Sequence, residues 1–175
     1  LIGTQMIAKG LDFPGATLVG IINADIGLNI PDFRSEEKVF QLIYQASGRS
    51  GRSKKPGEVV VQTFSPDNDA IKFSSKLRIK EYYKILLKER KDLHYPPFSW
   101  ITKIEISGFN KSYVKSTSNK IIKGLNGKFN GLYILGPAPC YYEKVRSKYR
   151  FQLLFKSLKT LDPNSKKLNQ FIKIN

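Results

Sequence analysis

Several residue types and sequence features are scarce or missing in this chain of 175 residues. Its one cysteine, Cys140, excludes an internal disulfide and a zinc site made of cysteines alone. No apolar run approaches the roughly 18 residues that a membrane-spanning helix needs, and no secretory signal is visible, so we expect no membrane association. The hydrophobic content of 41% is ordinary for a folded chain that buries a core.

Acidic side chains are few as well: the chain has 14 Asp and Glu against 30 Lys and Arg, a net charge of +16. The surplus is uneven, because residues 1–66 carry 7 basic and 6 acidic side chains, whereas residues 67–175 carry 23 and 8. A surplus of this size attracts polyanions over a Debye length, ~10 Å at moderate salt. We expect the second part to contact nucleic acid; the alternative is a lysine-rich composition whose charges are merely solvated.

The sequence lacks a Gly-x-x-x-x-Gly-Lys-Ser/Thr phosphate loop and an acidic Mg²⁺ motif after a strand. Residues 45–52 nevertheless read QASGRSGR, in which Arg49 and Arg52 each follow a glycine. Guanidinium groups match phosphate oxygens, and glycine lets the backbone come close to a partner. This pattern indicates one half of an ATP site; the alternative is a pair of solvated arginines at a helix end. Because the chain opens on Leu1 inside an expected strand, we expect a fragment that lacks the other half.

The first part of the chain alternates between strand and helix patterns. We expect strands over residues 1–5, 17–24 and 57–64 and a helix over residues 36–47. This alternation predicts an α/β layer with a parallel sheet. A further helix is expected over residues 79–91, before the prolines at 96 and 97 stop it.

The pattern changes to strands from Trp100 onward. We expect strands over residues 100–106, 132–136, 141–145 and 149–155, with helices over residues 111–125 and 163–174. This β-α-β-β-β-α order predicts a small α+β sandwich with both helices on one face of the sheet. The predicted domains are residues 1–66, a helical connector over 67–97, and residues 98–175.

Two short segments near the start carry candidate ligand-binding groups. Thr4 follows an expected parallel strand, and ligands bind at the carboxyl ends of such strands. The Thr4 hydroxyl can donate to a phosphate, and Asp12 can accept from a ribose hydroxyl or hold an arginine. Thr4 alone is more often structural, so the prediction depends on its combination with residues 45–52.

Residues 141–150 interleave aromatic and basic side chains, a pattern typical of nucleic-acid binding. Cations contact backbone phosphates, and unpaired bases stack on exposed rings for ~1–3 kcal/mol each. The alternative is that the alternating aromatics belong to the core and the cations face water. We expect Tyr149 to be buried, and Lys144, Arg146 and Arg150 to face outward and contact DNA.

Three long segments and three short ones closely resemble the PriA family of primosomal replication-restart helicases. The long ones are GTQMIAKGLDFPGATLVG, NADIGLNIPDFRSEEKVFQLIYQASGRSGR and PGEVVVQT; the short ones are YPPF, LGPAP and KVRSKYR. The first two resemble motifs V and VI of superfamily 2 helicases, which many motors share. The PDFR and LGPAP segments are more specific, and together the segments cover nearly the whole chain.

The resemblance implies a role for each matching residue. It implies a partial RecA-like lobe and an α+β C-terminal domain of an ATP-dependent 3′-to-5′ DNA helicase, which acts in replication restart and primosome assembly. Arg52 would be the arginine finger. The implied catalytic residues are Arg49, Arg52 and Gln45, the nucleotide-binding residues are Gly10, Asp12 and Gly48, and the DNA-binding residues are Thr4, Gln5, Lys9, Lys144, Arg146 and Arg150.

The resemblance also implies cofactors and partners. A lobe absent from this chain would complete the site for ATP and Mg²⁺, and the zinc-binding cysteines of the family would lie before Leu1. The implied partners are forked and single-stranded DNA, replication-restart proteins and single-stranded DNA-binding protein, in the bacterial cytoplasm. The family domain continues past a point like Asn175, so we expect truncation at that end too.

Two other functions remain open from the sequence. The excision-repair subunit UvrB carries a similar GLD-x-P stretch, although PDFR and LGPAP count against it. The chain could also be a non-catalytic DNA- or protein-binding module that uses its basic second part. As a fragment of a helicase, the 175 residues alone are expected to have no ATPase activity, since the Mg²⁺ site and the phosphate cradle are missing.

Overall fold

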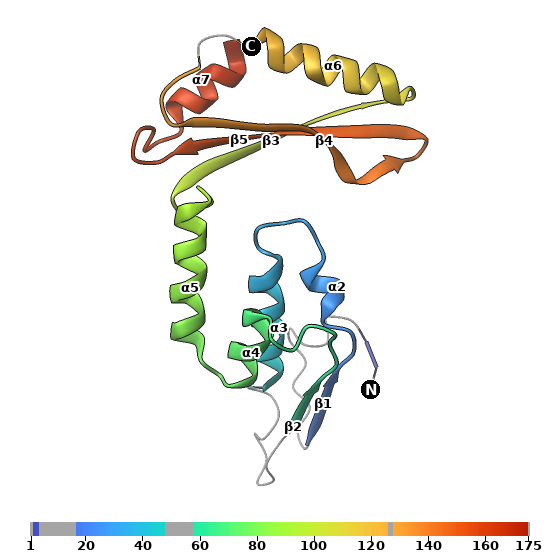
Figure 1. Cartoon of the computed structure of the whole chain (residues 1–175), viewed down its shortest axis with the longest axis vertical. Helices are drawn as coiled ribbons and strands as arrows, with labels where there is room; N and C mark the ends of the chain where they lie inside the picture. Colours follow the sequence, from blue (N-terminus) through green and yellow to red (C-terminus); the bar gives the residue numbers. More distant parts are fainter. Residues whose placement is uncertain (1, 4–16, 48–57, 126–127, 175) are drawn as a thin grey trace. The chain divides into compact units, whose positions relative to one another are not determined.

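The computed structural model describes residues 2–3, 17–47, 58–125 and 128–174. The chain divides into two compact units, one ending at Leu86 and the other beginning at Leu87 (Figure 1). The division falls inside helix α5 (Ile79–Asp92), which contributes to both units. In the described part of the chain, no helix is long and apolar enough to cross a membrane.

The first unit is built on a parallel pair of strands. β1 (Leu18–Ile21) pairs with β2 (Glu58–Val61) in parallel, and helix α3 (Ser35–Ser47) lies between them in sequence. The predicted strand–helix–strand order is therefore confirmed for these elements. The described sheet has two strands.

One face of this sheet is covered and the other is open. Val39 and Ile43 of α3 pack with Ile21 and Val61, which alternate with outward residues along their strands. On the other face, Leu18 is 62% exposed and Val60 is 51% exposed. The sheet buries only the side that faces α3.

Two short helices were not among the helices expected by residue range, although the second lies within the helical connector predicted over residues 67–97. They are α2 (Asp25–Leu28) and α4 (Asp69–Ser75), of 4 and 7 residues, too short for a periodic pattern. Asn68 caps α4 by accepting a hydrogen bond from the Ala70 amide. A second core, which is aromatic, lies between α3 and α5. There the rings of Phe40 and Tyr82 stack with their centres 4.1 Å apart.

The second unit is a three-stranded antiparallel sheet with two helices. The strands are β3 (Ser99–Gly108), β4 (Leu132–Val145) and β5 (Lys148–Leu158), with β5 in the centre, and the helices are α6 (Lys111–Gly124) and α7 (Lys166–Ile174). Both helices lie on the same face of the sheet (Figure 1), where Leu153 and Phe155 of β5 pack against Leu168 and Phe171 of α7. The predicted α+β arrangement with helices on one face is confirmed.

The expectation of two separate strands at 132–136 and 141–145 is wrong, because β4 runs through both. Two irregularities in its pairing with β5 interrupt the alternation that sequence reasoning follows. At the first, Gly136 has a φ of +104°, a conformation that glycine adopts without strain. At the second, Cys140–Glu143 lie opposite Arg150 alone. The unit therefore has the order β-α-β-β-α.

Candidate nucleic-acid interface

The predicted site residues divide between described and undescribed parts of the chain. Gln45, Lys144, Arg146 and Arg150 are described. The other candidates, Thr4, Gln5, Lys9, Gly10, Asp12, Gly48, Arg49 and Arg52, lie outside the described residues. Their roles remain predictions.

Gln45 lies near the end of α3 on its outward side. The side chains of Ile43 and Ala46 are buried against the first unit, whereas Gln45 is exposed. The hydroxyl of Ser47 donates to the Ile43 carbonyl at 2.9 Å and so satisfies a backbone acceptor in the last turn. The Gln45 side chain therefore lies outside the core, where it is accessible to a ligand.

The PDFR segment before α3 is held by one carboxylate. Asp32 accepts hydrogen bonds from the backbone amide of Arg34 at 2.9 Å and from its Nε and Nη2 at 3.1 and 2.9 Å. Lys38 adds an ion pair at 3.6 Å. The hydrogen bonds from the Arg34 side chain are the main reason why the pKa of Asp32 is lowered to about 2. This carboxylate stays ionised and fixes the loop that leads into α3.

In the second unit, the predicted DNA-binding residues lie around the hairpin that joins β4 to β5. Val145 pairs with Lys148, so Arg146 and Ser147 form a two-residue turn. Their φ angles of 47° and 64° are both left-handed, as in the turns that match the twist of paired strands. The turn presents the Arg146 side chain to solvent, as predicted.

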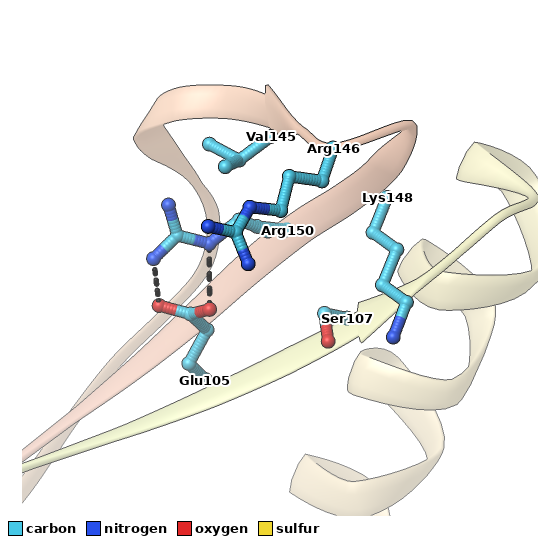
Figure 2. A pocket seen from close by; sticks show the side chains of 6 residues that line it. All are labelled: Glu105, Ser107, Val145, Arg146, Lys148 and Arg150. Atoms are coloured by element: carbon cyan, nitrogen blue, oxygen red, sulfur yellow. Dashed lines mark hydrogen bonds and ion pairs between the residues drawn. The ribbon is translucent and has the colours of Figure 1, made fainter.

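A pocket of about 330 Å³ lies beside this hairpin, on the face of the sheet that α6 and α7 leave uncovered. Figure 2 shows its lining residues: Glu105, Ser107, Val145, Arg146, Lys148 and Arg150. Ser107 and Arg150 are cross-strand partners, so their side chains share a face opposite to the core residues Ile106 and Phe151. The register of β3 and β5 thus assembles the pocket.

Arg150 is not free within this pocket. Its Nε and Nη2 donate to the two carboxylate oxygens of Glu105 at 2.6 and 2.5 Å, and about a quarter of its side chain is exposed (Figure 2). The hydrogen bond from Arg150 is the main cause of a lowered pKa at Glu105, and the same bond raises the pKa of Arg150. Both groups remain charged at neutral pH. Arg150 was expected to face outward; it does, but with a bound carboxylate.

Exposed aromatic rings surround the hairpin. Tyr141 and Tyr142, on the irregular stretch of β4, are 59% and 67% exposed, and their rings meet edge to face at 4.8 Å. The ammonium group of Lys144 lies 4.9 Å from the ring centre of Tyr149. Tyr149, which we expected to be buried, is half-buried, and it lies near the end of the sheet. Rings and cations therefore alternate along this surface.

The second unit matches a known family model. Residues 91–174 match the model described as the primosomal protein N C-terminal domain. A longer stretch of the chain, which includes the first unit, is similar to the replication restart protein PriA of Bacillus subtilis. The two are 40% identical over 157 residues, and this alignment covers 89% of the chain and 20% of that protein.

Other PriA proteins are similar over the same extent. The PriA of Chlamydia muridarum is 38% identical over 172 residues, or 98% of this chain and 23% of that protein. The PriA of Rickettsia prowazekii is 39% identical over 154 residues, or 88% of this chain and 24% of that protein. The chain thus spans about a fifth to a quarter of the length of these PriA relatives. The resemblance to PriA is confirmed.

Four lining residues of the pocket in this PriA-related unit were not predicted as site residues: Glu105, Ser107, Val145 and Lys148. The sequence places Lys148 in a basic run and Glu105 in the strand expected over residues 100–106, and Ser107 follows that strand. The pairing of β3 with β5 brings together residues 45 positions apart, such as Glu105 and Arg150. The alternation around Glu105 could have placed it on the outer face, but not next to an arginine.

Proposed function

We propose that the chain is part of an ATP-dependent 3′-to-5′ DNA helicase that acts in replication restart and primosome assembly. The observation that carries this proposal is the 38–40% identity to PriA proteins over 88–98% of the chain. Replication restart is what the names of these relatives state. The helicase chemistry rests on the motif residues 3–20 and 45–52.

In this proposal, the first unit supplies one side of an ATP site. Arg49 and Arg52 contact the terminal phosphates, with Arg52 stabilising the charge that develops during phosphoryl transfer. Gln45 orders the γ-phosphate region, and its outward position at the end of α3 is compatible with this role. Gly10, Asp12 and Gly48 approach the nucleotide. Another lobe provides the phosphate loop and Mg²⁺, and the zinc of the family is held outside this chain.

The proposed RecA-like lobe needs more sheet than the two described strands. The parallel pairing of β1 and β2 supports such a lobe, and so does the apolar side of these strands away from α3. Leu18 and Val60 on that side are typical of parallel strands that are buried on both faces.

The second unit is proposed to hold DNA, together with Thr4, Gln5 and Lys9 of the first. Lys144 and Arg146 contact backbone phosphates, with Arg150 beside them in its pair with Glu105, and Tyr141 and Tyr142 offer rings on which unpaired bases stack. The surplus of 23 basic over 8 acidic side chains in residues 67–175 favours this function. Other replication-restart proteins and single-stranded DNA-binding protein are further proposed partners, in the bacterial cytoplasm.

A chimera tests the motor function directly. This chain replaces the matching segment of Bacillus subtilis PriA, and DNA-stimulated ATP hydrolysis and strand unwinding are measured. We expect the chimera to be active and its Arg52→Ala variant to lose at least about a hundredfold in turnover, since an arginine finger contributes ~10³–10⁵.

The matched control is Arg78→Ala, because Arg78 is exposed, forms an ion pair with Glu81 three residues further on and lies 5.7 Å from the ring centre of Phe73. Full activity is expected for this variant. An active chimera that tolerates Arg52→Ala would refute the assigned arginine finger. ATP turnover by the 175-residue chain alone, abolished by Arg52→Ala, would refute the idea that another lobe is required.

A further inference from the structure

The pocket beside the β4–β5 hairpin combines three cations with one carboxylate. Arg146, Lys148 and Arg150 come from the turn and from β5, while Glu105 and Ser107 come from β3 (Figure 2). The pocket therefore carries a net charge of about two positive units around one hydroxyl. Its walls are strand residues and a tight turn, so the cations start from a rigid frame.

The three cations are not equivalent. The carboxylate of Glu105 takes two of the five N–H groups of Arg150, one on Nε and one on Nη2. Within the described part of the chain, no ion pair engages Arg146 or Lys148, although Lys148 lies 5.4 Å from the ring centre of Phe109. An incoming anion therefore meets two available cations and a third whose planar fork is already occupied.

We propose that this pocket binds a single phosphate of a nucleic-acid backbone, with Arg146 and Lys148 as its direct ligands and Glu105 as an internal competitor that holds Arg150 back. This inference rests on the proposed DNA-binding function of the second unit and adds a position for one phosphate. Ser107, which also lines the pocket, contributes a hydroxyl donor. Glu105 lowers the affinity because it both repels the phosphate and occupies the Arg150 fork.

A backbone phosphate fits this pocket better than an isolated phosphate ion does. Two exposed tyrosines, Tyr141 and Tyr142, lie on the β4 stretch opposite Arg150, where bases attached to the bound phosphate can stack. A free phosphate ion would use only the cations, and two solvated cations hold such an ion weakly. The surrounding rings thus favour a phosphate that belongs to a single strand.

The test measures binding of a fluorescent oligothymidylate of about 20 nucleotides to the whole chain by anisotropy, at salt concentrations from about 50 to about 200 mM. We expect Arg146→Ala and Lys148→Ala each to weaken binding roughly three- to fivefold, as the loss of one exposed ion pair does. Each should also reduce the salt slope by about 0.7, the value for one lost phosphate contact with a single strand.

The matched control is Lys120→Ala, which removes the same charge from the exposed side of α6 on the other face of the sheet. Its salt slope should stay within experimental error of the wild-type slope. If Lys120→Ala and Lys148→Ala lower the affinity and the slope equally, the surface binds DNA diffusely and the pocket proposal is overturned. If the wild-type chain binds no oligonucleotide, the proposed DNA-binding function itself fails.

Glu105→Gln tests the role of the carboxylate. Glutamine keeps an oxygen acceptor for Arg150 but removes the negative charge, so a phosphate can compete for the guanidinium. We expect about threefold tighter binding and a steeper salt slope, by about 0.7, as Arg150 becomes a further contact. Weaker or unchanged binding would overturn the role of Glu105 as a competitor. Inorganic phosphate, added as a competing ion, should displace the oligonucleotide no more than another salt of the same ionic strength does. Stronger displacement by phosphate would mean that the pocket binds the free ion instead.

Discussion

The buried lysine of β5 allows a sharp prediction about what stabilises the second unit. Lys156 is only 5% exposed, although it lies on the sheet face that the helices leave uncovered. Its ammonium group donates to the Leu93 carbonyl at 3.0 Å and lies 3.5 Å from the centre of the Tyr95 ring. Both partners come from the segment between α5 and β3, so Lys156 joins that segment to the central strand.

The ammonium group and the aliphatic stem of Lys156 contribute differently. A desolvated cation–π contact is worth ~2 kcal/mol and a hydrogen bond from a charged group ~1.5–3 kcal/mol. Burying the charge costs several kcal/mol, which offsets most of this gain. The three methylenes of the stem between Cβ and Nζ bury apolar surface, and each stabilises the fold by ~0.8 kcal/mol. We therefore expect Lys156→Met to change stability by less than about 1 kcal/mol and Lys156→Ala to cost about 2–3 kcal/mol.

The pH dependence of stability gives an independent check. Burial lowers the pKa of Lys156 below its ordinary value of 10.5. Between the folded-state pKa and 10.5, the unfolded chain binds more protons than the folded chain, so stability rises with pH in that window. Below the window, both states are protonated and the contribution is constant. The Lys156→Met variant should lack this rise.

The assay is urea denaturation followed by tryptophan fluorescence. Trp100 is the one tryptophan of the chain, and its Nε1 donates to the Asp162 carbonyl at 2.9 Å, so its signal reports the second unit. Lys103→Met, an exposed change on the same sheet face, is the control and should stay within about 0.5 kcal/mol of the wild type. A cost for Lys156→Met equal to that of Lys156→Ala would refute the reasoning, because it would place the stabilisation in the ammonium group.

Three further changes have definite expected outcomes. Asp162→Ala should cost about 2–3 kcal/mol in urea denaturation, because the buried carboxylate accepts from the amide of Leu168 at 3.0 Å. Hydrogen bonds outweigh burial and lower the pKa of Asp162 below 3.8, so its stabilisation should be complete above pH 3.8 and disappear as the pH falls through the folded-state pKa. Gly136→Ala should cost about 2 kcal/mol or more, since its Cβ would lie 2.7 Å from a backbone oxygen. Tyr142→Ala should leave the urea midpoint unchanged but weaken oligothymidylate binding by ~1–3 kcal/mol in an anisotropy titration.

Local periodicity was sufficient to predict most of the regular elements. The alternation in residues 149–155 lies within β5, and the helical spacing in residues 111–125 coincides with α6 to within one residue. Helices of one or two turns, α2 and α4, were not predicted individually, because the helical spacing is recognised only over longer windows. The prediction of two strands where the structure has one, β4, was wrong for a different reason. Irregular pairing with β5 breaks the alternation of buried and exposed residues without ending the strand.

The candidate site could be predicted only in part, because its partners come from distant positions. Composition and spacing identified Arg146 and Arg150, but the carboxylate that pairs with Arg150 lies on another strand. The burial of Lys156 could not be expected either, since alternation places it on the outer face and only the folded turn containing Tyr95 covers it. For Arg49 and Arg52, which lie outside the described residues, the sequence prediction stands alone.

The number of basic residues overstates how strongly the second part of the chain can hold DNA. Residues 67–175 carry a net charge of about +15, which would give a salt slope of about 10 with a single strand if each unit of net charge met a phosphate. Several cations are already engaged: Lys156 by a ring and a carbonyl, Arg150 by Glu105, and Lys111 by Glu143 at 2.6 Å. The helices and the open sheet face also point their charges in different directions, so one strand cannot meet them all. We therefore expect a slope of only about 2–4 for the whole chain with oligothymidylate; a slope near 10 would mean that DNA wraps the unit and that no single face forms the interface.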